Sequence, residues 1–114
     1  MNEARSSAAG AHHPQLGFLV SGGYNDGSSK STTEISSDGR TFSAYTPLPI
    51  ELWGHCMVAL DRDDGEFFLA GGWDGYYSSN RAFIHRGGQW DQVKWMWASR
   101  YRKKSNSLMQ IEMN

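Results

Sequence analysis

The chain has 114 residues, of which 39% are hydrophobic and 13% aromatic, and its formal net charge is −1. This length allows one domain. The near-neutral charge gives no field that would attract nucleic acid or an anionic membrane surface, and no apolar run reaches the ~18–20 residues that a membrane-spanning helix needs.

The first part of the chain reads as a tail followed by short strands. Residues 1–15 are rich in Ala, Ser, Gly and His without a period, and we expect them to be a disordered N-terminal tail. The pair Gly22–Gly23 closes the first strand, and Asp38–Gly39 marks a hairpin turn. The expected strands are 16–21, 31–36 and 41–45, with Phe42 as the core residue of the last.

The second part holds four further strands, expected at 54–60, 66–70, 80–85 and 89–93. The first of these, Gly54–Leu60, is almost continuously apolar, which predicts burial on both of its faces. The glycine pair Gly71–Gly72 ends the next strand. Residues 99–114 carry a basic run and read as a divergent tail.

Two stretches of the chain are copies of one pattern. Superposing the glycine pairs places Gly22 on Gly71 at an offset of 49 residues, and Phe42 falls on Trp90 at an offset of 48. A period of this length, built of four short strands, is typical of a propeller blade rather than of a solenoid.

The repeat resembles the kelch family. An apolar strand ends in Gly-Gly at Phe18–Gly23 and at Phe68–Gly72, and an aromatic residue follows in the last strand, Phe42 or Trp90. The stretch Trp53–Leu60, with a histidine near its start, resembles the first strand of the next blade. The resemblance covers about residues 16–101.

The resemblance implies an all-β fold, an incomplete kelch-type β-propeller. Residues 16–98 would be kelch repeats, with a three-stranded partial blade at 16–45 and one four-stranded antiparallel blade at 54–93. The kelch tyrosine is missing in the first copy, where Glu34 and Ile35 occupy the strand, and Phe83 or His85 takes its place in the second. The segment 101–108 also departs from the pattern.

Such propellers act as protein-interaction modules, for example as substrate adaptors or scaffolds, so the resemblance implies a protein partner. Two alternatives stay open: a fragment of a secreted or carbohydrate-active, galactose-oxidase-like enzyme, and a truncated product without independent function. Since propellers close with ~4–8 blades, we also expect self-association through exposed strand edges.

The loops that follow the glycine pairs would lie on one face of a kelch propeller, where its binding surface is. They are rich in aromatic residues, Asn, Asp and Arg, the composition of interface anchors. The alternative is that Trp73 and a tyrosine pack between blades. The predicted binding residues are Trp73, Asp74, Tyr76, Tyr77 and Arg81, with Tyr24 and Asn25 in the first copy.

Nothing in the sequence predicts an enzyme, a cofactor or a metal site. The adjacent His55 and Cys56 invite a nucleophile-and-base interpretation, but neighbours on a strand point to opposite faces. His12 and His13 would lie in the flexible tail, without a preformed geometry for a metal.

Cysteine usage bears on the compartment. Cys56 is the only cysteine, and residues 1–15 hold no apolar segment of a signal peptide. Both observations favour the cytoplasm, and an extracellular location stays open because the chain looks truncated.

Overall fold

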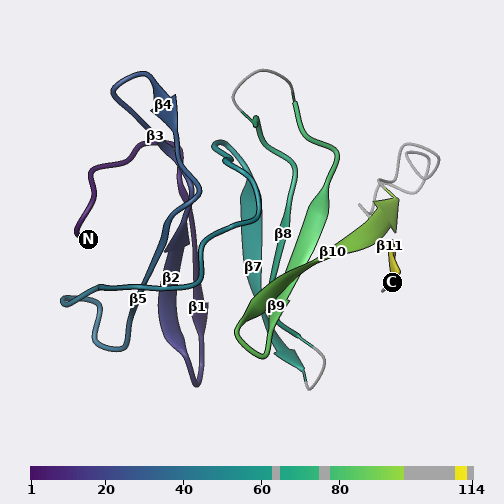
Figure 1. The fold of residues 1–114 in the computed structure, drawn as a ribbon. Coiled ribbons are helices and arrows are strands. Elements are labelled where there is room, and N and C mark those ends of the chain that lie inside the picture. Colours follow the sequence, from purple (N-terminus) through teal and green to yellow (C-terminus); the bar gives the residue numbers. More distant parts are fainter. Residues whose placement is uncertain (63–64, 75–77, 97–109, 113–114) are drawn as a thin grey trace, which may run out of the picture.

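The structure is a computed structural model that describes residues 1–62, 65–74, 78–96 and 110–112. These residues form strands and turns and contain no helix, so the described part of the chain offers no helix that could cross a bilayer. All strand pairs are antiparallel. The predicted all-β class is confirmed (Figure 1).

The first half of the chain forms the N-terminal sheet, in the order β1-β2-β5-β6, and a small hairpin of β3 and β4. The strands are β1 (Ala9–His13), β2 (Gly17–Ser21), β3 (Tyr24–Asn25), β4 (Ser28–Ser29), β5 (Thr33–Ser36) and β6 (Ser43–Ala44).

The prediction of a disordered tail over residues 1–15 is wrong. Strand β1 pairs with β2 along its whole length, from Ala9 opposite Ser21 to His13 opposite Gly17. Ala9 and His13 are buried, whereas Gly10 and His12 face outward. Alanine and histidine on the buried face give only a weak apolar alternation, so the sequence did not predict this strand. The sheet therefore has four strands instead of the expected three.

The second half forms the C-terminal sheet, in the order β11-β10-β9-β8-β7. Strands β7 to β10 lie side by side in the order in which they occur along the chain, as expected for residues 54–93. The strands are β7 (Cys56–Arg62), β8 (Gly65–Ala70), β9 (Ala82–Arg86), β10 (Gln89–Met96) and β11 (Gln110–Glu112). Apart from β11, most of the predicted basic tail lies outside the described residues.

The two sheets lie next to each other, with β1 beside β7 (Figure 1). We call the sheet face that carries Phe18 or Phe67 the front face and the face that carries Leu19 or Phe68 the back face. Leu19 is fully buried and belongs to the same core cluster as Phe67, Leu69 and Phe83. The back face of the N-terminal sheet thus covers the front face of the C-terminal sheet.

This packing follows the sequence repeat. The offset of 49 residues that superposes the glycine pairs also places Phe18 on Phe67 and Leu19 on Phe68. The sheets are therefore arranged as successive copies in the same orientation, back to front. Burying a Phe or Leu side chain of this kind contributes about 1.5–3 kcal/mol.

A second cluster lies on the back face of the C-terminal sheet, so β8 and β9 are buried on both sides. Its buried members are Phe68, Ala70, Ala82, Ile84 and Val93. Strand β7 differs, because Cys56 is exposed and Val58 keeps 45% of its surface. The prediction that 54–60 is buried on both faces is wrong, since no described strand covers the back of β7 at these two positions.

The glycine pairs show how the sheets fit together. Gly22 has a φ of 63°, and a Cβ built there would lie 2.3 Å from the Leu52 carbonyl oxygen and 2.7 Å from the His55 ring. The next residue, Gly23, donates its N–H to the same Leu52 oxygen at 2.7 Å. At the equivalent Gly71, φ is 79° and no described residue lies within 4 Å of a built Cβ.

Candidate functional site

A tight hairpin, β3–β4, follows the first glycine pair. Asp26 and Gly27 occupy its tip with φ of 52° and 77°, as a two-residue hairpin turn with two positive φ values requires. Tyr24 is held at its base by a reciprocal backbone pair with Ser6, both bonds being 2.9 Å long.

The backbone pairing of Tyr24 has a counterpart at Trp73. Its N–H donates to the Trp53 carbonyl at 2.8 Å, and the Trp53 N–H donates back at 3.0 Å. Trp73 stands 49 residues after Tyr24, the same offset as the glycine pairs. Each copy thus places one aromatic residue directly after its Gly-Gly pair and fixes the backbone against the entry of its own first strand.

Tyr24, Trp53 and Trp73 form an exposed aromatic cluster. The Tyr24 and Trp53 rings meet edge to face with centroids 5.8 Å apart, and Trp53 and Trp73 lie nearly parallel at 5.9 Å. Tyr24 is 39% and Trp73 46% exposed. Large, rigid rings with a polar edge that remain in solvent are typical anchors of protein interfaces.

The structure brings together some of the predicted binding residues. Trp73 and Tyr24 share the cluster through Trp53, Asn25 follows Tyr24 in β3, and Asp74 follows Trp73. The remaining three are placed elsewhere or not described: Arg81 is exposed one residue before β9, and Tyr76 and Tyr77 lie outside the described residues.

Trp53 is the member of the cluster that sequence reasoning missed. It lies in the stretch that resembles the start of a blade, and nothing in its neighbourhood predicts that its ring would join two loops. The sequence signal that could have found it is its position at the start of the second copy of the repeat, because a residue there must lie between the two glycine pairs.

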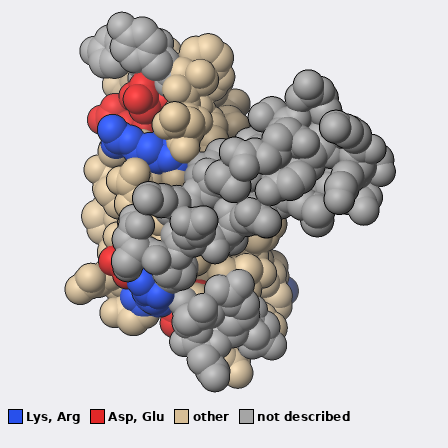
Figure 2. Space-filling model, turned by 90° about the vertical axis from the view of Figure 1, so that its right-hand side faces the viewer, with Lys and Arg blue, Asp and Glu red and all other residues tan. Residues whose placement is uncertain are grey.

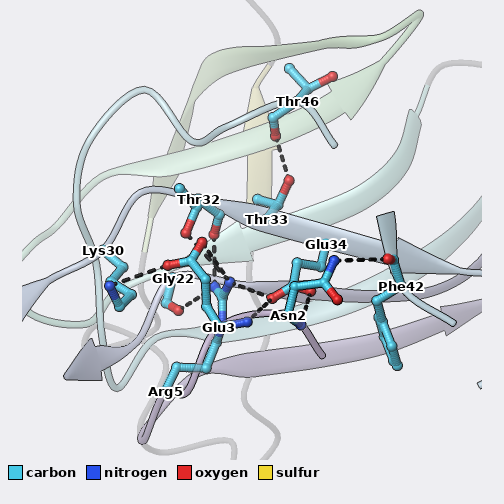
Figure 3. Close-up of polar contacts among 10 residues, drawn as sticks. All are labelled: Asn2, Glu3, Arg5, Gly22, Lys30, Thr32, Thr33, Glu34, Phe42 and Thr46. Atoms are coloured by element: carbon cyan, nitrogen blue, oxygen red, sulfur yellow. Dashed lines mark hydrogen bonds and ion pairs between the residues drawn. The ribbon is translucent and has the colours of Figure 1, made fainter. Parts of the chain in front are cut away.

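A polar network lies on the front face of the N-terminal sheet (Figure 3). Arg5 has a fully buried side chain and forms an ion pair with Glu34 at 2.9 Å. Its guanidinium also donates to the carbonyls of Gly22 and Thr32, and the backbone N–H groups of Asn2 and Glu3 donate to the Glu34 carboxylate. The network fastens the start of the chain to β5.

The contacts of Glu34 set its charge state. Burial on its own raises the pKa of this carboxyl, but the N–H groups of Asn2 and Glu3 and the Arg5 guanidinium lower it, and the net pKa lies below the ordinary value. Glu34 therefore stays ionised at neutral pH. By the repeat it stands where Phe83 stands in the second copy, so a buried ion pair replaces an apolar side chain.

A buried histidine links the two sheets. The His55 Nε2 lies 2.8 Å from the Ser21 Oγ, and His55 Nδ1 has no hydrogen-bond partner among the described residues. Burial lowers the pKa of His55 to about 4, so the ring is neutral near pH 7. Its neighbour Cys56 is exposed, which confirms that the two side chains point to opposite faces and cannot form a catalytic pair.

A second buried histidine, His85, sits among aromatic rings of both sheets. Its Nδ1 lies 2.7 Å from a carboxylate oxygen of Glu66, and the rings of Tyr45 and Trp90 pack against it at 5.2 and 5.0 Å. Burial raises the pKa of Tyr45, and the Glu66 carboxylate raises it further. Together with a hydrogen bond from the Trp90 indole to the Thr46 carbonyl, these contacts hold the sheets together at the end away from the aromatic cluster.

The arrangement of the histidines and of the charged side chains bears on metal binding and on binding through charge. In the described ranges, no three His, Cys, Asp or Glu side chains are grouped so as to hold a metal ion. His12 stacks on Phe18, while His13 points to the other side and accepts the N–H groups of Gln15 and Leu16. On the side shown in Figure 2, described basic side chains lie next to acidic ones, without a large field of one sign.

Comparison with known proteins gives one partial similarity. No family model matches the chain. A stretch of 77 residues is 32% identical to the spermatocyte protein spe-26 of Caenorhabditis elegans. The match covers 66% of this chain but only 13% of spe-26, so the chain spans a small part of its relative's length.

Proposed function

We propose that the chain consists of two successive kelch-type propeller units and acts as a protein-interaction module through its aromatic cluster. Two features support the kelch-type assignment. Each half folds into an antiparallel meander in chain order, and each second strand, β2 or β8, ends in a pair of glycines with positive φ. The back-to-front packing of the two sheets is also the way in which propeller blades follow one another.

The single observation that carries the binding function is the exposure of Tyr24 and Trp73 around Trp53. The fold buries Phe67, Phe83 and Leu69 completely. Tyr24 and Trp73, in contrast, keep 39% and 46% of their surface exposed. Aromatic rings left in solvent at a rigid position lose little conformational entropy on binding. A folded or extended protein partner is the class of ligand that fits them.

The similarity to spe-26 is compatible with several roles. By its name, spe-26 is a spermatocyte protein. For this chain we propose a cytoplasmic adaptor or scaffold role without catalytic activity, cofactor or metal.

Affinity capture tests the proposed function. The tagged wild-type chain and its Trp73→Ala and Tyr24→Ala variants are used to capture proteins from a cell extract, and each captured protein is purified and titrated against all three. We expect at least one protein whose affinity falls tenfold or more in Trp73→Ala, the loss expected of an interface anchor.

Phe18→Ala, titrated at a concentration where the wild type is monomeric, is the matched control, because Phe18 is an equally exposed aromatic (42%) on the front face of the N-terminal sheet, outside the aromatic cluster. This variant should bind the same protein as the wild type does. A glycan array read in parallel separates the carbohydrate-binding alternative. If Trp73→Ala and Phe18→Ala bind every captured protein alike, the aromatic cluster is not the binding site.

A further inference from the structure

Where β1 and β2 form the front face of the N-terminal sheet, no described strand covers it. The equivalent face of the C-terminal sheet is buried, and Phe67 and Leu69 have no exposed surface. On the N-terminal sheet, the residue equivalent to Phe67 is Phe18, which is 42% exposed and carries the His12 ring at 4.5 Å. A groove of about 450 Å³ runs along it, and its lining includes His12, Phe18, Val20 and Phe42.

The back of β7 is open in a complementary way. In the first copy, Ala9 on the back of β1 is 7% exposed and packs into the core that faces the second sheet. Its equivalents in the second copy are the exposed residues of β7, Cys56 and, two positions on, Val58. Gly71 belongs to the same strip, since the space filled by Leu52 and His55 at Gly22 holds no described residue at Gly71.

We propose that a second copy of this chain docks its N-terminal front face, along β1, onto the open strip behind β7 of the first. Within the chain, the back of β1 packs on the front of β7. Between copies, the back of β7 packs in the same way on the front of β1 of the next copy. The apolar residues of the two surfaces are Phe18 and Val20 on one side and Cys56 and Val58 on the other, with His12 beside Phe18. The rest of the C-terminal back face is already buried and takes no part.

The occupant is a second copy because the chain carries both halves of the interface. Each half is the repeat equivalent of a surface that is buried between its own two sheets, so the shapes that fit within the chain fit between chains. Such a contact is head-to-tail, and it joins copies into a ring if the rotation closes and into a filament if it does not.

Sedimentation of the wild type, Phe18→Lys, Val58→Lys and an equimolar mixture of the two variants tests this arrangement. We expect the wild type to assemble as concentration rises and each variant alone to stay monomeric. In the mixture, the intact back of Phe18→Lys meets the intact front of Val58→Lys, so a species of twice the monomer mass forms and grows no further. Phe18 is 42% and Val58 45% exposed, and circular dichroism melts verify that both variants fold.

Three outcomes overturn the proposal. The first is a wild type that stays monomeric at all concentrations. The second is a Val58→Lys variant that still forms dimers alone, which would show a front-to-front contact. The third is a mixture without a heterodimer. As an independent readout, the Cys56 thiol should react more slowly with a maleimide as the wild-type concentration rises, and Phe18→Lys should abolish that protection.

Discussion

Glu34→Ala is expected to lower the free energy of unfolding by about 3–5 kcal/mol, the usual cost of removing one partner of a buried ion pair. The variant leaves the Arg5 guanidinium buried without its carboxylate, since its side chain has no exposed surface. It also removes the acceptor of the Asn2 and Glu3 N–H groups. Urea unfolding monitored by tryptophan fluorescence measures the loss.

The matched control is Asp91→Ala, which breaks the exposed ion pair with Arg86. Exposed pairs contribute about 0–1 kcal/mol, so this variant should unfold almost as the wild type does. A double variant, Arg5→Met with Glu34→Leu, should recover much of the stability because no unpaired charge remains buried. Equal losses in Glu34→Ala and Asp91→Ala would show that the network does not form.

Protonation of His55 is expected to cost about 3 kcal/mol of stability between pH 6.5 and pH 4. The pKa of this ring is about 4 in the folded state and lies at its ordinary value of 6.5 in the unfolded chain. Between these values the unfolded state binds more protons, so stability is complete above pH 6.5 and declines as the pH falls toward 4. The cause is burial of a ring that gains no counter-ion.

Urea unfolding of the wild type and His55→Gln across this range isolates the effect. Carboxylates such as Glu34, whose folded pKa is lowered, lose their contribution at lower pH in both proteins, so the difference between the two profiles belongs to His55. The wild-type profile should be steeper by about 3 kcal/mol over the range. Parallel profiles, or a His55 ring that titrates near 6.5 by NMR, would contradict the buried position.

Strands with strong apolar signals were predicted within one or two residues. Strand β8 combines the run Phe67–Ala70 with a following glycine pair, and its buried residues are those that the sequence marks as apolar. Strand β1 was missed because its inward-facing residues, Ala9, Ala11 and His13, give only a weak apolar alternation. Phe42 was expected in a core, but it is half-buried in the groove of the front face, since no sheet of the described residues covers that side.

In the candidate site, too, residues with a local sequence signal were predicted, and residues whose role depends on distant contacts were not. Tyr24 and Trp73 were predicted because each follows a glycine pair within one copy of the repeat. Trp53 was not, because its role depends on contacts with both turns. The pair Arg5–Glu34 joins residues 29 positions apart, and a single arginine in a polar segment gives no local sign of a buried partner.

The central claim is that the two sheets are successive copies packed back to front, and the difference between Gly22→Ala and Gly71→Ala tests it most directly. Both glycines have positive φ, so both variants carry a similar backbone strain of ~1–2 kcal/mol. Of these two glycines, only Gly22 is packed against described residues, the segment that leads into β7, where a new Cβ would meet the Leu52 oxygen. Unfolding experiments should therefore show an additional loss of about 1–3 kcal/mol for Gly22→Ala. Equal losses, or a larger one for Gly71→Ala, would contradict the packing.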